Sequence, residues 1–115
     1  MSYVAFILET TVNDRGALDS LMADAVSAVQ ANEPGTTHYE WNISEDGATM
    51  ITYERFADTD AALAHLGGFS PFIERLMAAV TVDKMTVYGA PSDELKEALA
   101  GFSPTFMSEI GGFAR

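Results

Sequence analysis

The chain has no cysteine and few basic residues, and each shortage excludes a class of function. Without cysteine there is no disulfide, no thiolate metal ligand and no cysteine nucleophile. Only 6 lysine and arginine residues stand against 17 aspartate and glutamate residues, a formal net charge of -11. Such a surface repels phosphate backbones and anionic lipid headgroups. We therefore expect no nucleic acid and no membrane as partners, and a neutral or aromatic small molecule as the easier substrate.

Long hydrophobic runs and targeting signals are also missing. No apolar run approaches the roughly 20 residues of a transmembrane helix. The N-terminus meets Glu9 and Asp14 early and has no basic segment before an apolar run, unlike a signal peptide. We therefore expect a cytoplasmic protein. The 115 residues, 48% hydrophobic and 20% charged, fit one globular domain with one core.

Motifs for cofactors and metals are absent as well. The chain contains no glycine-rich phosphate-binding loop, so no nucleotide cofactor is indicated. His38 and Glu40 alternate on a predicted strand and could face one ion, but a third ligand at a typical spacing is missing. We predict no cofactor and no metal site.

The spacing of apolar residues predicts the order β-α-β-β-α-β. Asn13 or Asp14 can cap the first helix, which Pro34-Gly35 ends. We expect the second helix to be interrupted at Gly67-Gly68 and to resume at Pro71. The predicted elements are strand 3–11, a first helix between its cap and Pro34-Gly35, strands 36–44 and 48–56 with a turn at 45–47, helix 59–66 resuming over 71–79, and strand 81–88.

This order is that of an α+β, ferredoxin-like unit with an antiparallel sheet. Its helices cover one face only, so we expect a second copy on the other face, giving a homodimer that forms an α+β barrel. We assign 1–90 to this domain and 91–115 to a C-terminal helical extension whose helix Ser92 caps. The extension is expected to pack on its own subunit or on the partner, because it carries apolar side chains at Phe102, Phe106, Met107, Ile110 and Phe113.

The hairpin holds most of the candidate chemistry. If residues of like parity pair, one face carries Tyr39, Trp41, Ile43, Ile51 and Tyr53, and the other carries His38, Glu40, Asn42, Thr52 and Glu54 with Met50 and Phe56. The polar set lines a cavity or forms a structural network. Glu40 and Glu54 side by side would raise the pKa of one carboxyl, unless Arg55 or Arg75 neutralises it. His38 and His65, the two histidines, are candidates for proton transfer or are bystanders.

Three segments in a fixed order carry a resemblance. They are Glu33-Pro34-Gly35-Thr36-Thr37-His38-Tyr39-Glu40-Trp41, then Tyr53-Glu54-Arg55-Phe56-Ala57-Asp58, and a helix with His65. The chain resembles the antibiotic biosynthesis monooxygenase family of small dimeric α+β barrel proteins, from Tyr3 to Tyr88. The likeness to the haem-degrading branch is weaker. The Asn of its first strand and the Trp of its third are absent, and His65 alone matches.

The resemblance implies an oxygenase without flavin, haem or metal, in which a deprotonated aromatic or quinol-like substrate passes an electron to dioxygen. It implies a proton acceptor and donors to an oxyanion in a dry pocket. We assign Asn42, Trp41, His65 and Glu54 as catalytic candidates, and His38, Glu40, Tyr53, Phe56 and Phe72 as substrate contacts. Phe102 or Phe106 would close or fill the pocket. The alternatives are a ligand-binding dimer without chemistry and a structural dimer whose pocket is filled by side chains.

Overall fold

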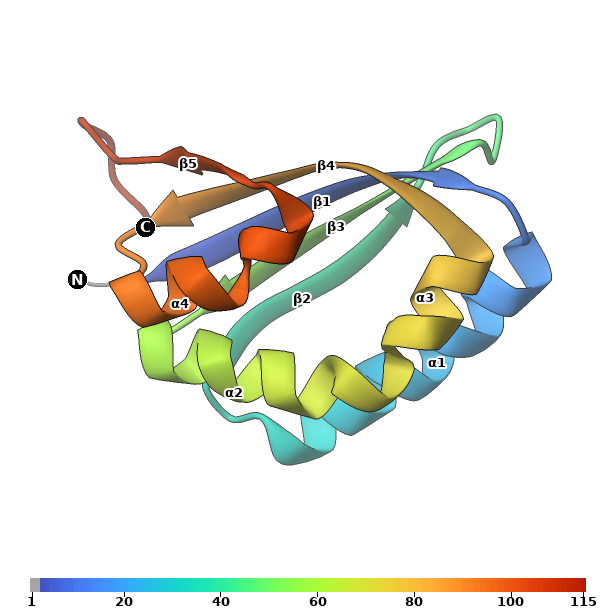
Figure 1. Cartoon of the computed structure of the whole chain (residues 1–115), viewed down its shortest axis with the longest axis horizontal. Coiled ribbons are helices and arrows are strands. Elements are labelled where there is room, and N and C mark those ends of the chain that lie inside the picture. Colours follow the sequence, from blue (N-terminus) through green and yellow to red (C-terminus); the bar gives the residue numbers. More distant parts are fainter. Residues whose placement is uncertain (1–2) are drawn as a thin grey trace.

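The computed structural model describes residues 3–115 as one sheet with all its α-helices on the same side (Figure 1). The strand order is β2-β3-β1-β4-β5, antiparallel except for β5, which runs parallel to β4. This confirms the predicted α+β, ferredoxin-like order. The elements are β1 (Val4–Val12), α1 (Arg15–Asn32), β2 (Thr36–Ile43), β3 (Thr49–Phe56), α2 (Thr59–Phe69), α3 (Ile73–Ala79), β4 (Val80–Gly89), α4 (Asp93–Ala98) and β5 (Thr105–Met107), with 3-10 turns at Ser70–Phe72 and Ala100–Phe102.

Helix α1 begins and packs as its sequence predicts. The Asp14 carboxylate accepts a hydrogen bond from the Ala17 amide and caps the helix. One stripe of α1 is buried against the sheet, namely Leu18, Leu21, Ala25 and Val29. Between the helices and the sheet lies the core, in which the rings of Phe6 and Phe56 are 4.8 Å apart.

The pairing of β2 with β3 differs from the prediction by one residue. The turn includes Ala48, since the Ser44 amide donates to the Thr49 carbonyl and the Ala48 amide to the Asp46 carboxylate. A four-residue turn pairs residues of opposite parity, so Tyr39 lies opposite Glu54 and Trp41 opposite Thr52. The predicted faces were therefore wrong. Tyr39 and Trp41 share the helix-covered face with Thr52 and Glu54.

The break in the second helix also lies elsewhere than predicted. Helix α2 continues through Gly67 and Gly68 to Phe69, and the 3-10 turn Ser70–Phe72 separates it from α3. A glycine inside a helix costs only about 1 kcal/mol relative to alanine. Pro71 has no amide hydrogen to donate, and the α-helical pattern stops there.

The extension packs on its own chain near its start and is exposed near its end. Ser92 caps α4, as predicted, by accepting from the Leu95 amide, and Leu95 and Leu99 are fully buried. Ile110 and Phe113 are 103% and 81% exposed. Between residues 3 and 115 no helix is long and apolar enough to cross a bilayer. The boundary at residue 90 and the cytoplasmic location stay predictions.

Candidate functional site

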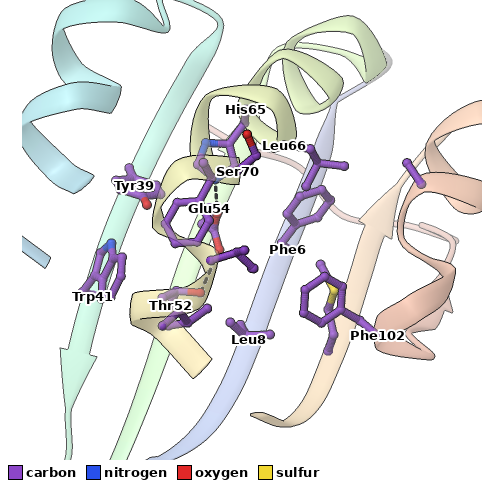
Figure 2. A pocket seen from close by; sticks show the side chains of 15 residues that line it. Phe6, Leu8, Tyr39, Trp41, Thr52, Glu54, His65, Leu66, Ser70 and Phe102 are labelled. Atoms are coloured by element: carbon purple, nitrogen blue, oxygen red, sulfur yellow. Dashed lines mark hydrogen bonds and ion pairs between the residues drawn. The ribbon is translucent and has the colours of Figure 1, made fainter. Parts of the chain in front are cut away.

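A cavity of about 290 Å3 lies between the helix-covered face of the sheet and helices α2 and α3 (Figure 2). Its volume is close to the roughly 300–1,000 Å3 of typical ligand pockets, far above the few tens of Å3 of a cavity filled by side chains. Most of the wall is apolar. The lining residues are Phe6, Leu8, Tyr39, Trp41, Thr52, Glu54, His65, Leu66, Phe69, Ser70, Ile73, Leu76, Met85, Ala98 and Phe102.

A carboxylate and an imidazole form the polar part of this wall. Glu54 projects from β3, and its Oε1 lies 2.9 Å from Nε2 of His65 on α2. The Thr52 hydroxyl donates to the other carboxylate oxygen at 2.8 Å. Figure 2 shows Glu54 between Thr52 and His65 at the edge of the cavity. Both oxygens of Glu54 are thus held in place by neighbouring side chains.

A second carboxylate holds the far side of the imidazole. Oε1 of Glu33, the residue that ends α1, lies 2.7 Å from Nδ1 of His65. The side chains of His65, Glu33 and Glu54 are only 4%, 9% and 10% exposed. This buried row, Glu33–His65–Glu54, joins the cavity wall to the turn that follows α1. Buried charges are tolerated when they are paired and hydrogen-bonded in this way.

The row fixes the charge state of His65. Burial lowers the pKa of His65, but the hydrogen bond and charge of Glu54, together with those of Glu33, outweigh it, so this pKa lies above its ordinary value. The two carboxylates therefore favour the imidazolium form of His65. In this form the ring donates from both nitrogens and balances one of the two carboxylate charges.

Two aromatic side chains with polar hydrogens stand beside the row on β2. Burial, and then the negative charge of Glu54, raises the pKa of Tyr39, so its phenol stays protonated. The rings of Tyr39 and Trp41 meet edge to face, with centroids 6.2 Å apart. The indole N–H of Trp41 is buried and makes no hydrogen bond of good geometry within the described part of the chain, although its interaction with the Tyr39 phenol lowers that pKa slightly against the effect of burial. A buried donor without a partner is costly, and a ligand oxygen would satisfy it.

The structure brings together three of the four predicted catalytic residues, His65, Glu54 and Trp41. Asn42 lies on the opposite face of the sheet, where its amide is 3.4 Å from the Ile51 carbonyl. Two predicted contacts, Phe56 and Phe72, neighbour the site without lining the cavity. Their rings are 5.2 Å from that of His65 and 5.7 Å from that of Phe69, respectively.

The other predicted contacts lie on the far face. His38, Glu40 and Tyr53 follow the register of Asn42, and His38 is hydrogen-bonded to Glu40. That bond lowers the pKa of Glu40. The predicted pairing of Glu40 with Glu54 was therefore wrong, because the two carboxylates project from opposite faces. Neither arginine contacts Glu54, since Arg55 lies over the ring of Tyr3 and Arg75 pairs with Asp24.

Sequence reasoning missed Tyr39 as a cavity residue and Glu33 as a partner of His65. The correct length of the hairpin turn would have placed Tyr39 on the helix-covered face. Glu33 is the first residue of the Glu-Pro-Gly-Thr turn, but no chemistry was assigned to it from the sequence. Phe102 lines the cavity as expected of the extension, whereas Phe106 lies outside it and is 40% exposed. No group of three or more metal-ligating side chains suited to an ion occurs in residues 3–115.

The comparisons with known proteins agree with this architecture. Residues 3–68 match the antibiotic biosynthesis monooxygenase family. The chain belongs to this family. Membership supports a general role like that of a small-molecule monooxygenase. No curated protein matches the sequence significantly.

Solved structures show the same fold. MupZ from Pseudomonas fluorescens has a TM-score of 0.87 at 21% identity, covering 100% of this chain and 91% of its own. SnoaB from Streptomyces nogalater, described as a cofactor-independent oxygenase, has a TM-score of 0.68 at 22% identity, covering 80% and 96%. Rv0793 from Mycobacterium tuberculosis has a TM-score of 0.60 at 26% identity, covering 80% and 97%. The match to MupZ includes the extension beyond β4. In the present chain this extension supplies Ala98 and Phe102 to the cavity.

Proposed function

We propose that the chain is a cofactor-independent monooxygenase of small aromatic or quinol-like molecules. The observation that carries this proposal is a carboxylate, Glu54, fixed by His65 and Thr52 at the wall of an apolar cavity. A positioned base in a poorly hydrated site is what removal of a weakly acidic C–H or O–H proton requires. The similarity to a cofactor-independent oxygenase, SnoaB, supports the same reaction class.

The proposed reaction starts with transfer of a substrate proton to Glu54. The resulting carbanion gives one electron to dioxygen, and the substrate radical and superoxide combine to a peroxide. Protonation of the peroxide and loss of water leave a carbonyl, so that a CH2 group and O2 become C=O and H2O. The Tyr39 hydroxyl and the Trp41 N–H line the same cavity and are the donors assigned to stabilise the negative oxygen.

The charge in the site favours a neutral substrate. Two carboxylates and one imidazolium leave the buried row with a net negative charge, and the whole chain carries -11. An anion entering the cavity would be repelled and desolvated, because no lysine or arginine is among the lining residues and the imidazole of His65 is already paired with two carboxylates. A flat molecule with one or two oxygen atoms suits the apolar walls and the two aromatic donors.

A second candidate is a redox-neutral acid–base reaction in the same cavity. The observation that favours it is that Glu54, His65 and the Tyr39 hydroxyl are all proton-transfer groups. Its first step is the same proton abstraction, after which the anion is reprotonated or closes a ring. Oxygen uptake separates the two reactions, and a ligand bound without turnover would instead identify a binding protein.

We also propose that two copies associate through the face of the sheet that carries no helix (Figure 1). Ile7, Ile51 and Tyr53 project there and are only partly buried within the single chain. A sheet with apolar residues on both faces is stable in water when both faces are covered. The homodimer leaves the cavity on the helix-covered side of each copy.

The first experiment measures dioxygen uptake and solvent deuterium incorporation with anthrone- and quinol-type substrates, using metal-free protein and a protein-free control for spontaneous oxidation. The wild type is compared with Glu54→Gln and with a matched surface variant, Glu97→Gln on α4. The proposal expects protein-dependent uptake that falls roughly 100- to 10,000-fold in Glu54→Gln only. Deuterium incorporation without uptake would select the acid–base reaction. Neither signal across the panel would reject both.

A further inference from the structure

Glu33 does not line the cavity, yet it is the second carboxylate on His65. We propose that Glu33 is a positioning residue that acts on the base Glu54 through His65, by keeping the imidazole protonated and turned so that Nε2 donates to Glu54. This inference rests on the proposed function, since it assigns Glu54 as the base. Glu33 thereby becomes a determinant of the pH range in which the cavity is active.

The geometry leaves few protonation states for the row. Both ring nitrogens of His65 lie within hydrogen-bond distance of a carboxylate oxygen. Nδ1 is close to Glu33, and Nε2 is close to Glu54. A neutral imidazole has only one N–H, so it cannot donate to two ionised carboxylates. With both glutamates ionised, the row is complete only when His65 is an imidazolium. Removing the charge of Glu33 removes one of the two groups that favour that state.

Among residues 3–115, the two glutamates are the charges that act on the pKa of His65, and no other charge replaces Glu33. The ring packs against Phe56 on β3, Phe69 on α2 and Tyr39 on β2, with centroid distances of 5.2, 5.7 and 5.4 Å. Tyr39 is the one further titratable side chain in these contacts, and its phenol stays neutral. The two glutamates are therefore the charges that set the protonation of His65.

The turn after α1 fixes Glu33 in place. Its backbone N–H donates to the Val29 carbonyl at the helix end, and the Thr36 hydroxyl donates to its Oε1 at 3.0 Å. A Cβ at Gly35 would lie 2.6 Å from the Cβ of Ala61, so this glycine lets the turn approach α2 closely. The Glu-Pro-Gly-Thr turn thus acquires a chemical role, which is to deliver a carboxylate to His65.

A pair of adjacent glycines offers a matched test of this geometry. A Cβ at Gly68 would lie 2.7 Å from Oε2 of Glu33, whereas a Cβ at Gly67 would have no neighbour within 4 Å. Both positions are inside α2, where alanine is the better helix former. Gly68→Ala therefore displaces the Glu33 carboxylate from His65, and Gly67→Ala changes the helix without touching it.

The primary experiment follows the imidazole of His65 by NMR as a function of pH. His38 is the other histidine, so a His38→Gln background leaves a single imidazole signal. Glu33→Gln keeps an acceptor oxygen but removes the charge. We expect the titration of His65 to move to lower pH in Glu33→Gln and in Gly68→Ala, and to stay at the wild-type position in Gly67→Ala. An unchanged titration in Glu33→Gln would overturn the proposal.

The second readout is the pH profile of turnover with a substrate from the panel above. Loss of activity at high pH marks deprotonation of His65, and this limb should move to lower pH in Glu33→Gln. On the limb, kcat should fall roughly tenfold for each pH unit by which the limb moves, with KM little changed. If the role of Glu33 were purely structural, Glu33→Gln would lower thermal stability and leave the high-pH limb of the profile unchanged. That result would contradict the inference. Failure of the proposed function is a different result, namely no turnover by the wild type.

Discussion

Trp41 on β2 is the register partner of Thr52 on β3, and both side chains face the helices. The neighbour of Trp41 in the chain, Asn42, consequently points to the other side of the sheet. One residue of register therefore decides which of two adjacent hydrogen-bond donors can reach a ligand.

The first prediction compares these two neighbours. Trp41→Phe keeps most of the ring but loses the unpartnered N–H, so we expect turnover to fall on the order of 100-fold, the usual cost of one oxyanion donor. Asn42→Ala removes an amide from the far face and should leave turnover within about twofold of the wild type. Steady-state kinetics on both variants, with circular dichroism as a folding control, measures this. Loss of activity in Asn42→Ala alone would indicate that the active site lies on the far face of the sheet.

The second prediction concerns stability as a function of pH. The pKa of His65 is raised in the folded chain above its ordinary value near 6.5, so the folded state binds more protons than the unfolded state between these two values. This contribution to stability is fully present below the ordinary value and is lost as pH rises through the folded-state pKa.

We therefore expect the free energy of unfolding in urea to decrease from pH 6 towards alkaline pH in the wild type. The decrease should be smaller in His65→Gln, which has no group to titrate, and should persist in His38→Gln, whose substitution lies on the other face of the sheet. Equal slopes in the wild type and His65→Gln would contradict the prediction.

The third prediction tests the phenol beside the row. Burial, and secondarily the charge of Glu54, raises the pKa of Tyr39, so this side chain should remain a neutral donor well above neutral pH. The tyrosinate absorbance that appears on raising the pH to about 11 should then be the same in the wild type and in Tyr39→Phe. A smaller signal in Tyr39→Phe would show that Tyr39 ionises in this range.

Much of the fold follows from local signals in the sequence. The cap at Asp14 and the stripe from Leu18 to Val29 fix helix α1, and the alternation of the strands gives the element order. The site was less predictable, because its geometry depends on a single turn. The side chain of Asp46 accepts a hydrogen bond from the Ala48 amide, so that Ala48 is part of the turn. The extra turn residue shifts the pairing of β2 with β3 by one position along the whole hairpin.

Contacts between distant segments were beyond the reach of spacing arguments. Glu33 and His65 are 32 positions apart and meet because Gly35 allows the turn against α2 and Gly68 leaves room for the carboxylate. No periodicity encodes this meeting. From the sequence we interpreted Gly67-Gly68 as a helix break. In the structure the absence of a side chain at Gly68 leaves room for the carboxylate of Glu33 in the buried row.

The fourth prediction concerns the proposed dimer. Ile51 is on the helix-free face, opposite Glu9 on β1 and away from the cavity. Ile51→Lys should place a charge in the proposed interface and convert the dimer to monomers in analytical ultracentrifugation. Gln30→Lys, an exposed change on α1 on the other side of the sheet, is the control and should remain dimeric. A wild type that is already monomeric at micromolar concentration would refute the proposed assembly.

The fifth prediction tests the extension as a wall of the cavity. Phe102, in the 3-10 turn after α4, packs on the core and lines the cavity, whereas Phe106 on β5 is 40% exposed and lies outside it. Phe102→Ala removes apolar wall and admits water, so ligand affinity should fall roughly tenfold and the free energy of unfolding by about 1–3 kcal/mol. Phe106→Ala removes the same side chain from the surface and should change affinity less than about twofold.

Titration calorimetry with a quinol-type ligand and urea unfolding measure both quantities. Equal effects of the two substitutions on affinity would mean that the extension does not shape the binding site, because only one of these phenylalanines touches the cavity.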